Sequence, residues 1–288
     1  MNFEKIIVPT DFSPCSMAAV SFAASLAKNA QSEIHLVHII EVPDMAPVFP
    51  ITPEFGGSDL GVALSMDMSQ NMMEDARKKM DTFIKHPEFE GLLIKPSVEL
   101  GSTSDLINFT AQKYKADMIV MCAHGNGGEN DFFIGSNAEK LIRSSSIPVL
   151  TIKNKVQVPK KIVFASDFTD ESSHIFSYVK AFSEIFQAKI HLLKVNTLEK
   201  FETTRESRTL IENFIKTSGL KEIDYTIYND LILESGIVNF IKDENADMIA
   251  LGTHNSHFFD HLFSKSLTEE LLNHCGCPVL TVNIERVH

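Results

Sequence analysis

Lys5-Ile6-Ile7-Val8-Pro9-Thr10-Asp11-Phe12-Ser13 recurs 156 residues later (161 − 5) as Lys161-Ile162-Val163-Phe164-Ala165-Ser166-Asp167-Phe168-Thr169. The offset has fallen to 130 (278 − 148) by the end of each copy, where Pro148-Val149-Leu150-Thr151 matches Pro278-Val279-Leu280-Thr281. Self-similarity of this kind indicates a duplicated domain. The sequence therefore predicts one domain over residues 1–153, a second over 160–288, and a short polar linker between them.

The two offsets differ because the first copy carries extra residues, about 26 (156 − 130), between its second and third strands. Much of the surplus falls in residues 43–61, which hold four prolines and three glycines. Such a stretch is not expected to form a helix or a central strand. We expect a surface loop, and a lid or partner-docking segment is the alternative.

Apolar runs and helical stretches alternate within each copy. In the first copy, strands are expected at residues 6–8, 34–40, 92–98, 118–121 and 149–152, several of them nearly continuous as buried parallel strands require. Ser13-Pro14 supplies an N-cap and a first-turn proline for a helix through residues 18–27. Capping boxes are expected at Ser136–Glu139 and Ser266–Glu269. The pattern predicts α/β architecture, with an open five-stranded parallel sheet covered by helices on both faces in each copy.

The composition argues against nucleic-acid-binding, membrane-spanning and disulfide-rich classes of protein. The formal net charge is −12 at pH 7, and neither half has a basic face for nucleic acid or an anionic membrane. The chain has no apolar run of about 18 residues and no export-signal pattern, so we expect a soluble, cytoplasmic protein. The four cysteines are too few and scattered for a disulfide framework and are expected to be reduced thiols.

A glycine-containing segment is the strongest chemical signal. The strand at residues 118–121 runs into Cys122-Ala123-His124-Gly125-Asn126-Gly127-Gly128, and a helix is expected to open at Gly135-Ser136. Glycines between a strand and a helix let the backbone approach a phosphate, and the N-terminal end of the helix favours an anion. Neither an ordinary P-loop nor a standard dinucleotide motif is present.

Four segments together resemble the universal stress protein family: Ile6–Ser13, His38-Ile39, Ala123-His124-Gly125 and Ile147–Leu150. The resemblance covers both copies and implies two tandem Rossmann-like domains, of the adenine nucleotide alpha hydrolase-like type. It also implies that the fifth strands of the two copies pair within the chain, as an intrachain pseudo-dimer, with a homodimer of tandems as a further expectation.

The nucleotide-binding branch of that family carries the motif G-2x-G-9x-G-[ST] after its fourth strand. Gly125, Gly135 and Ser136 fit the motif, whereas Cys122 stands where its first glycine belongs. The resemblance implies that ATP or AMP, with or without Mg, binds the first copy. Asp11 would meet the ribose or base, Ile39 would present its backbone to adenine, and residues after the fourth strand would hold the phosphates. The expected binding residues are Pro9, Thr10, Asp11, Ile39, Met121, Cys122, His124, Gly125, Gly135, Ser136 and Asn137. Asp11 has a structural alternative as a turn residue.

The second copy departs further from the motif. It keeps Gly252, but Asn255 and Lys265 replace the other two glycines, so weak binding or none is expected there. The strand histidines His35, His38 and His191 are expected to be satisfied structural residues, and no metal ligand set or catalytic set is recognised.

The leading hypothesis is a regulatory or protective stress-response protein that binds adenine nucleotide and is not an efficient enzyme. A scaffold or interaction module with two vestigial sites is the alternative. A slow ATPase ranks third, because no general base is evident.

Overall fold

The computed structural model describes residues 2–41, 58–123, 135–153, 157–169, 172–220, 223–253, 271 and 276–283, without the side chains of 58–68 and 253. The first copy contains β1 (Lys5–Pro9), α1 (Pro14–Ala30), β2 (Glu33–Ile40), α2 (Ser58–Phe83), the 3₁₀ turn η1 (Pro87–Phe89), β3 (Leu93–Leu100), α3 (Thr103–Tyr114), β4 (Met118–Cys122), α4 (Ser136–Ser144) and β5 (Val149–Ile152). The second contains β6 (Lys161–Ala165), α5 (Ser172–Phe186), β7 (Lys189–Asn196), α6 (Thr204–Ser218), β8 (Asp224–Asn229), α7 (Leu233–Glu244), β9 (Met248–Thr253) and β10 (Val279–Asn283).

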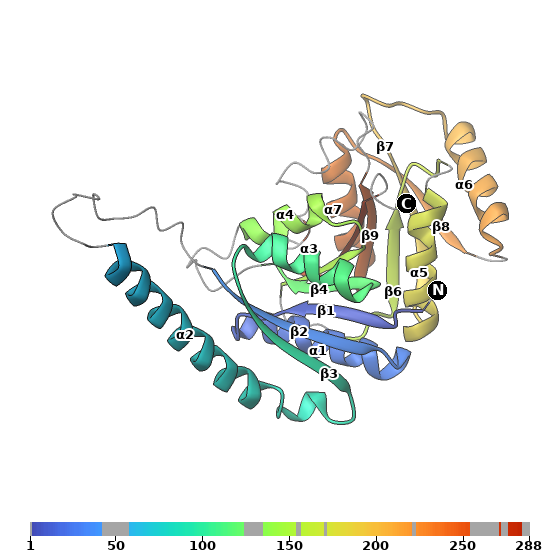
Figure 1. Cartoon of the computed structure of the whole chain (residues 1–288). Coiled ribbons are helices and arrows are strands. Elements are labelled where there is room, and N and C mark those ends of the chain that lie inside the picture. Colours follow the sequence, from blue (N-terminus) through green and yellow to red (C-terminus); the bar gives the residue numbers. More distant parts are fainter. Residues whose placement is uncertain are drawn as a thin grey trace.

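The strands form one sheet in the order β3-β2-β1-β4-β5-β10-β9-β6-β7-β8 (Figure 1). Neighbouring strands are parallel within each copy, which confirms the predicted pair of open five-stranded parallel sheets. At the centre β5 and β10 pair antiparallel, with Leu150 opposite Leu280. Thr151 Oγ1 donates to Val279 O at 3.2 Å and Thr281 Oγ1 donates to Val149 O at 3.1 Å. These reciprocal hydrogen bonds make the junction between the copies nearly symmetric.

Helices cover both faces of the sheet because side chains alternate along each strand. On β1, Ile6 and Val8 belong to the cluster that packs under α1 and α5, whereas Ile7 belongs to the cluster under α3, α4 and α7. The first cluster runs from one copy into the other, since the Phe3 ring lies 4.9 Å from the Phe182 ring of α5. The two copies therefore share one apolar core on that face.

The N-terminal end of α1 follows the prediction. Ser13 is the N-cap and its side chain accepts a hydrogen bond from Ser16 N, with a proline in the first turn. The predicted loop at residues 43–61 is wrong at its end, because α2 begins at Ser58 and includes Gly61. Glycine inside a helix costs only about 1 kcal/mol relative to alanine, which a 26-residue helix tolerates. Residues 43–57 lie outside the described part of the chain.

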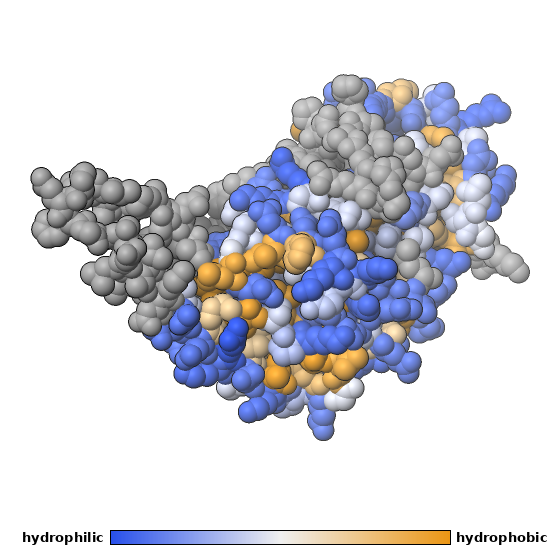
Figure 2. Space-filling view, in the orientation of Figure 1, coloured by the Kyte–Doolittle hydropathy of each residue, from blue (hydrophilic) through white to orange (hydrophobic). Residues whose placement is uncertain are grey.

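Most of the face seen in Figure 2 is hydrophilic, with smaller hydrophobic areas over α3 and β3. Exposed apolar residues of these two elements include Phe109 on α3 and Leu93 and Leu100 on β3. In the second copy Leu198, Phe201, Leu231 and Ile232 are exposed in the loops that follow β7 and β8. Within the described residues, no helix is long and apolar enough to span a bilayer.

Two histidines occupy equivalent positions in the second strand of each copy. Nε2 of His35 contacts the Glu33 carboxylate, and His191 Nε2 lies 2.9 Å from Thr226 Oγ1. Burial is the largest cause that lowers the pKa of both imidazoles below the ordinary value of 6.5, and for His35 the neighbouring Glu33 opposes it. Both side chains therefore have hydrogen-bonding partners inside the sheet, in agreement with a structural role.

Lowered histidine pKa values predict that acid weakens the fold. Between the lowered pKa and about 6.5 the unfolded chain binds more protons than the folded chain, so the free energy of unfolding falls as the pH drops. We expect urea denaturation to give a lower unfolding free energy near pH 5.5 than near pH 7.5. A variant with His35→Gln and His191→Gln should show a shallower pH dependence. An unchanged slope in that variant would assign the acid sensitivity to other groups.

Candidate functional site

The order of the strands places a topological switch point in each copy, and we refer to this position as the crevice of that copy. In the first copy β1 lies between β2 and β4, so the chain leaves β1 toward one side of the sheet and leaves β4 toward the other. In open parallel sheets, ligands bind beyond the carboxyl ends of the strands at such a switch point. Asp11 follows β1, and Cys122 ends β4. Two of the predicted site residues thus lie at the crevice.

The turn between β1 and α1 has an unusual backbone. Phe12 has φ 62°, in the left-handed region, and its N–H donates to Thr10 Oγ1 at 3.1 Å. The Asp11 carboxylate accepts from Ser13 N at 3.0 Å. The second copy repeats this geometry, with φ 60° at Phe168 and Thr169 N donating to Asp167 at 3.3 Å. Because both copies have this geometry, we infer that Asp11 stabilises the turn in addition to any other contact that it makes.

The end of β2 lies against that turn. Thr10 N donates to Val37 O at 2.9 Å. The His38 ring packs at a tilt against the Phe12 ring, with centroids 4.4 Å apart, and its Nδ1 lies 2.7 Å from Thr10 O. Ile39 is half-buried and packs against the α3 side of the core. His38 therefore has a structural role, and Ile39 lies at the edge where the resemblance expects adenine.

The first turn of α4 forms the opposite wall. Gly135 N donates to Ala123 O at 2.8 Å, which ties the start of the helix to the end of β4. The capping box predicted at Ser136 is wrong, because Gly135 is itself the N-cap and no side-chain hydrogen bond caps the helix among the described residues. Gly135 has φ −61°, which any residue adopts, so lack of a side chain is the property that distinguishes it. The Ser136 side chain is exposed, and the neighbouring Gly135 has no side chain. The Ser136 hydroxyl and the backbone N–H groups of this turn are donors that fit a phosphate.

Glu41 was not among the residues predicted for the site. It directly follows β2, and its carboxylate accepts from Asn137 Nδ2 at 3.0 Å, so it links β2 to the first turn of α4. Hydrogen bonding by Thr103, followed in size by burial in the opposite direction, leaves the pKa of Glu41 below its usual value. An acidic residue next to the second strand was the available sequence signal. Asn137, predicted to hold phosphate, is engaged with this carboxylate.

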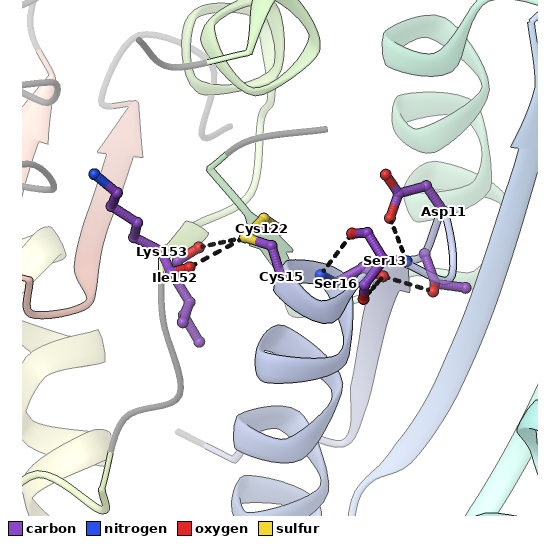
Figure 3. Close-up of a disulfide and its surroundings, with 8 residues drawn as sticks. Asp11, Ser13, Cys15, Ser16, Cys122, Ile152 and Lys153 are labelled. Atoms are coloured by element: carbon purple, nitrogen blue, oxygen red, sulfur yellow. Dashed lines mark hydrogen bonds between the residues drawn. A yellow bond between two sulfur atoms is a disulfide. The ribbon is translucent and has the colours of Figure 1, made fainter. Parts of the chain in front are cut away.

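Cys122 is not a thiol in this structure. It forms a disulfide with Cys15, which lies in the first turn of α1, with a Cα–Cα separation of 5.7 Å (Figure 3). The expectation that all four cysteines are reduced is therefore wrong for this pair. Cysteine counting could not find it, because 107 residues separate the two positions and only the fold brings them together. Cys122 is 8% exposed and belongs to the core on the α1 side of the sheet.

Most of the predicted site residues gather at this edge. Pro9, Thr10 and Asp11 end or follow β1, Ile39 lies near the end of β2, Met121 and Cys122 end β4, and Gly135, Ser136 and Asn137 begin α4. Met121 is buried in the core rather than open to the crevice. His124 and Gly125 lie outside the described residues, as do His254, Asn255 and Lys265 of the second copy.

The second copy has a different group in its crevice. Lys194 occupies the position equivalent to His38 (194 − 38 = 156). Its buried ammonium lies 3.2 Å from Glu202 Oε1 and donates to Asp167 O at 3.3 Å. Both Lys194 and Asp167 line a small pocket between β6, β7 and α7. A Cβ at Gly236 of α7 would lie 2.6 Å from Val195 Cγ1, so this helix packs closely on the end of β7. The crevice of the second copy therefore contains an ion pair, with a small pocket beside it.

Across the described ranges, no group of three or more His, Cys, Asp or Glu side chains is arranged to hold a metal ion.

Comparisons with known proteins agree with the fold. The model of the universal stress protein family matches residues 2–153 and 233–283. Universal stress protein Slr1230 of Synechocystis sp. is 22% identical over 293 residues, which cover 96% of this chain and 99% of that protein. Universal stress protein MJ0531 of Methanocaldococcus jannaschii is 29% identical over 159 residues, 55% of this chain and 85% of that protein. A solved universal stress protein from Archaeoglobus fulgidus has the same fold, with a TM-score of 0.69, 18% identity and coverage of 98% and 97% of the two chains. The chain belongs to the universal stress protein family and has its tandem, two-copy form.

Proposed function

We propose that the first copy binds an adenine nucleotide, ATP or AMP, at the crevice between β1 and β4. The observation that carries the proposal is that Asp11 follows β1 and the first turn of α4 follows β4, the two neighbouring strands at the switch point of the sheet. Gly135 and Ser136 match the end of the family's nucleotide motif. Backbone N–H groups and the helix dipole at Gly135–Asn137 would hold phosphate, and the Asp11 carboxylate would accept from the ribose.

The second copy has a supporting role in this proposal. Its crevice already contains the ion pair of Lys194 and Glu202, and its motif has lost two glycines. The pairing of β5 with β10 and the shared core support an intrachain pseudo-dimer as part of this proposal. One nucleotide per chain is the expected result.

We assign the protein a regulatory or protective role in the cytoplasm rather than a catalytic one. A ligand that prefers one conformation shifts the protein toward that conformation. The stability of the nucleotide-bound conformation would therefore rise with the concentration of adenine nucleotide. A second candidate is an interaction module, which the exposed apolar side chains Leu198, Phe201, Leu231 and Ile232 favour. Failure of nucleotide to bind either copy would select the second candidate.

Ligand-dependent thermal unfolding tests the proposal, and Asp11 has a matched control. A ligand at 100 times its dissociation constant stabilises the folded chain by about 2.7 kcal/mol, so AMP or ATP should raise the midpoint of unfolding. Asp11→Ala should weaken binding at least about tenfold, because a hydrogen bond to a charged group is lost. Asp167→Ala removes the same turn contact from the second copy and should leave the nucleotide response intact. If the two variants lose the response to nucleotide equally, Asp11 has no role in binding beyond its contact in the turn.

A further inference from the structure

The disulfide occurs only in the copy that keeps the nucleotide motif. Cys15 and Cys122 correspond in the second copy to Glu171 (171 − 15 = 156) and Gly252 (252 − 122 = 130), which cannot form one. Elsewhere the copies repeat even small details of the same turn: Thr10 Oγ1 lies 3.1 Å from Ser16 Oγ, and Ser166 Oγ lies 2.7 Å from Ser172 Oγ. The cross-link is therefore an addition to the first copy and not a requirement of the fold.

The disulfide joins the two segments that form the walls of the crevice. Cys15 lies two residues after Ser13, which caps α1 and donates its N–H to Asp11. Cys122 precedes Ala123, whose carbonyl accepts from Gly135 N. Figure 3 shows the disulfide between the end of β5 and the turn that carries Asp11. Breaking the bond would remove the covalent link between the start of α1, beside the Asp11 turn, and the strand that positions the first turn of α4.

The surroundings of Cys15 accommodate the reduced form as well. Lys153 O lies 3.1 Å from Cys15 Sγ and Ile152 O lies 3.8 Å away, so a Cys15 thiol has a carbonyl acceptor in place. Cys15 is half-buried, whereas Cys122 is 8% exposed, so an external thiol reaches the Cys15 sulfur more readily. Disulfides in a cytoplasm are usually transient or redox-sensing, which fits a pair whose reduced form also has a hydrogen-bond acceptor.

We propose that Cys15 and Cys122 form a reversible thiol–disulfide site, and that the oxidised form binds the phosphates of the nucleotide more tightly than the reduced form. The proposal rests on the proposed function of the first copy. The disulfide holds the two walls at one separation before the ligand arrives, whereas in the reduced chain the ligand must order them, and preorganisation of this kind increases affinity.

The redox step uses a dithiol as reductant. One dithiol thiolate attacks Cys15 Sγ and forms a mixed disulfide, and Cys122 leaves as a thiolate that takes up a proton. The second thiolate of the reductant then attacks the reductant's sulfur in the mixed disulfide. This closes the reductant's disulfide and releases Cys15, which takes up a proton and becomes a thiol. Two electrons and two protons pass from the dithiol to the cysteines, and a disulfide oxidant reverses the step.

Calorimetric titration of AMP and ATP into the full chain tests the coupling. The oxidised chain and the dithiothreitol-reduced chain are compared, and mass spectrometry after alkylation measures the thiol state of Cys15 and Cys122. The oxidised chain should bind at least about 5-fold more tightly, the lower end of typical coupling between sites. Cys15→Ser should match the reduced chain under both conditions. Cys277→Ser, which changes a buried cysteine of the second copy, should keep the full redox response.

The outcomes separate this inference from the proposed function. Equal affinity in both redox states overturns the inference and leaves nucleotide binding standing. Absence of binding in both states overturns both proposals. Complete alkylation of Cys15 and Cys122 without reductant also overturns the inference, because the disulfide would then not form. By linkage, nucleotide should shift the thiol–disulfide equilibrium toward the disulfide by the same factor as the affinity change.

Discussion

Replacing Glu202 with alanine is expected to lower the free energy of unfolding by about 3 kcal/mol. The Lys194 side chain is 5% exposed and its ammonium lies 3.2 Å from the Glu202 carboxylate. Removing the partner of a buried charge leaves that charge without compensation, at a cost of about 3–5 kcal/mol when both groups are buried. Here the Glu202 side chain is 33% exposed, which reduces the cost. Because Lys194 also donates to Asp167 O, we place the loss at the lower end of that range. Urea denaturation followed by circular dichroism measures it.

Two further variants control this result. Lys161 and Glu244 form a second ion pair in the same copy, with side chains 27% and 44% exposed, so Glu244→Ala should cost less than about 1 kcal/mol. The double variant with Lys194→Met and Glu202→Ala removes both charges and should be more stable than Glu202→Ala alone. A Glu202→Ala loss no larger than that of Glu244→Ala would show that the pair does not stabilise the crevice of the second copy.

Replacing Phe182 with alanine is expected to cost about 3–5 kcal/mol, the usual range for a buried phenylalanine. Phe182 is fully buried on α5 and its ring contacts Phe3 of the first copy at 4.9 Å. The substitution therefore opens a cavity in the core that the two copies share. Phe201→Ala is the control, because this side chain is 70% exposed and surface changes stay within about 0.5 kcal/mol.

Chemical denaturation also shows how far Phe182→Ala acts. Signals from both copies should shift together, because β5 pairs with β10 and the aromatic cluster joins α1 to α5 through Phe22 and Phe186, whose rings lie 5.7 Å apart. Hydrogen exchange of peptides from each copy separates the two signals. Destabilisation confined to the second copy would contradict a shared core.

The features that the sequence predicted correctly are those that depend on residues close together in the chain. Buried parallel strands show as continuous apolar runs, and the repeated turn after β1 gives the same Asp in each copy. Ser13-Pro14 marked the start of α1 correctly, since an N-cap and a first-turn proline act within a single turn. The same local logic placed the capping box one residue too late at Ser136, where Gly135 is the cap.

The features that the sequence did not reveal depend on distant contacts. Cys15 pairs with Cys122 across 107 residues, and Glu41 reaches Asn137 across 96. Lys194 and Glu202 are close in sequence, but only the burial of the lysine in the fold makes their pairing important. A single sequence carries no signal for such pairs, because their meeting depends on the order of the strands.

Calorimetric titration of AMP and ATP into the oxidised full chain tests nucleotide binding by the first copy most directly. We predict about one nucleotide per chain, and binding at least about 100-fold weaker in Gly135→Lys, because a lysine side chain would occupy space that the phosphates need. Asn213→Lys adds the same charge on the exposed face of α6 and should bind like the wild type. No heat at millimolar nucleotide, two sites per chain, or unchanged binding by Gly135→Lys would contradict it.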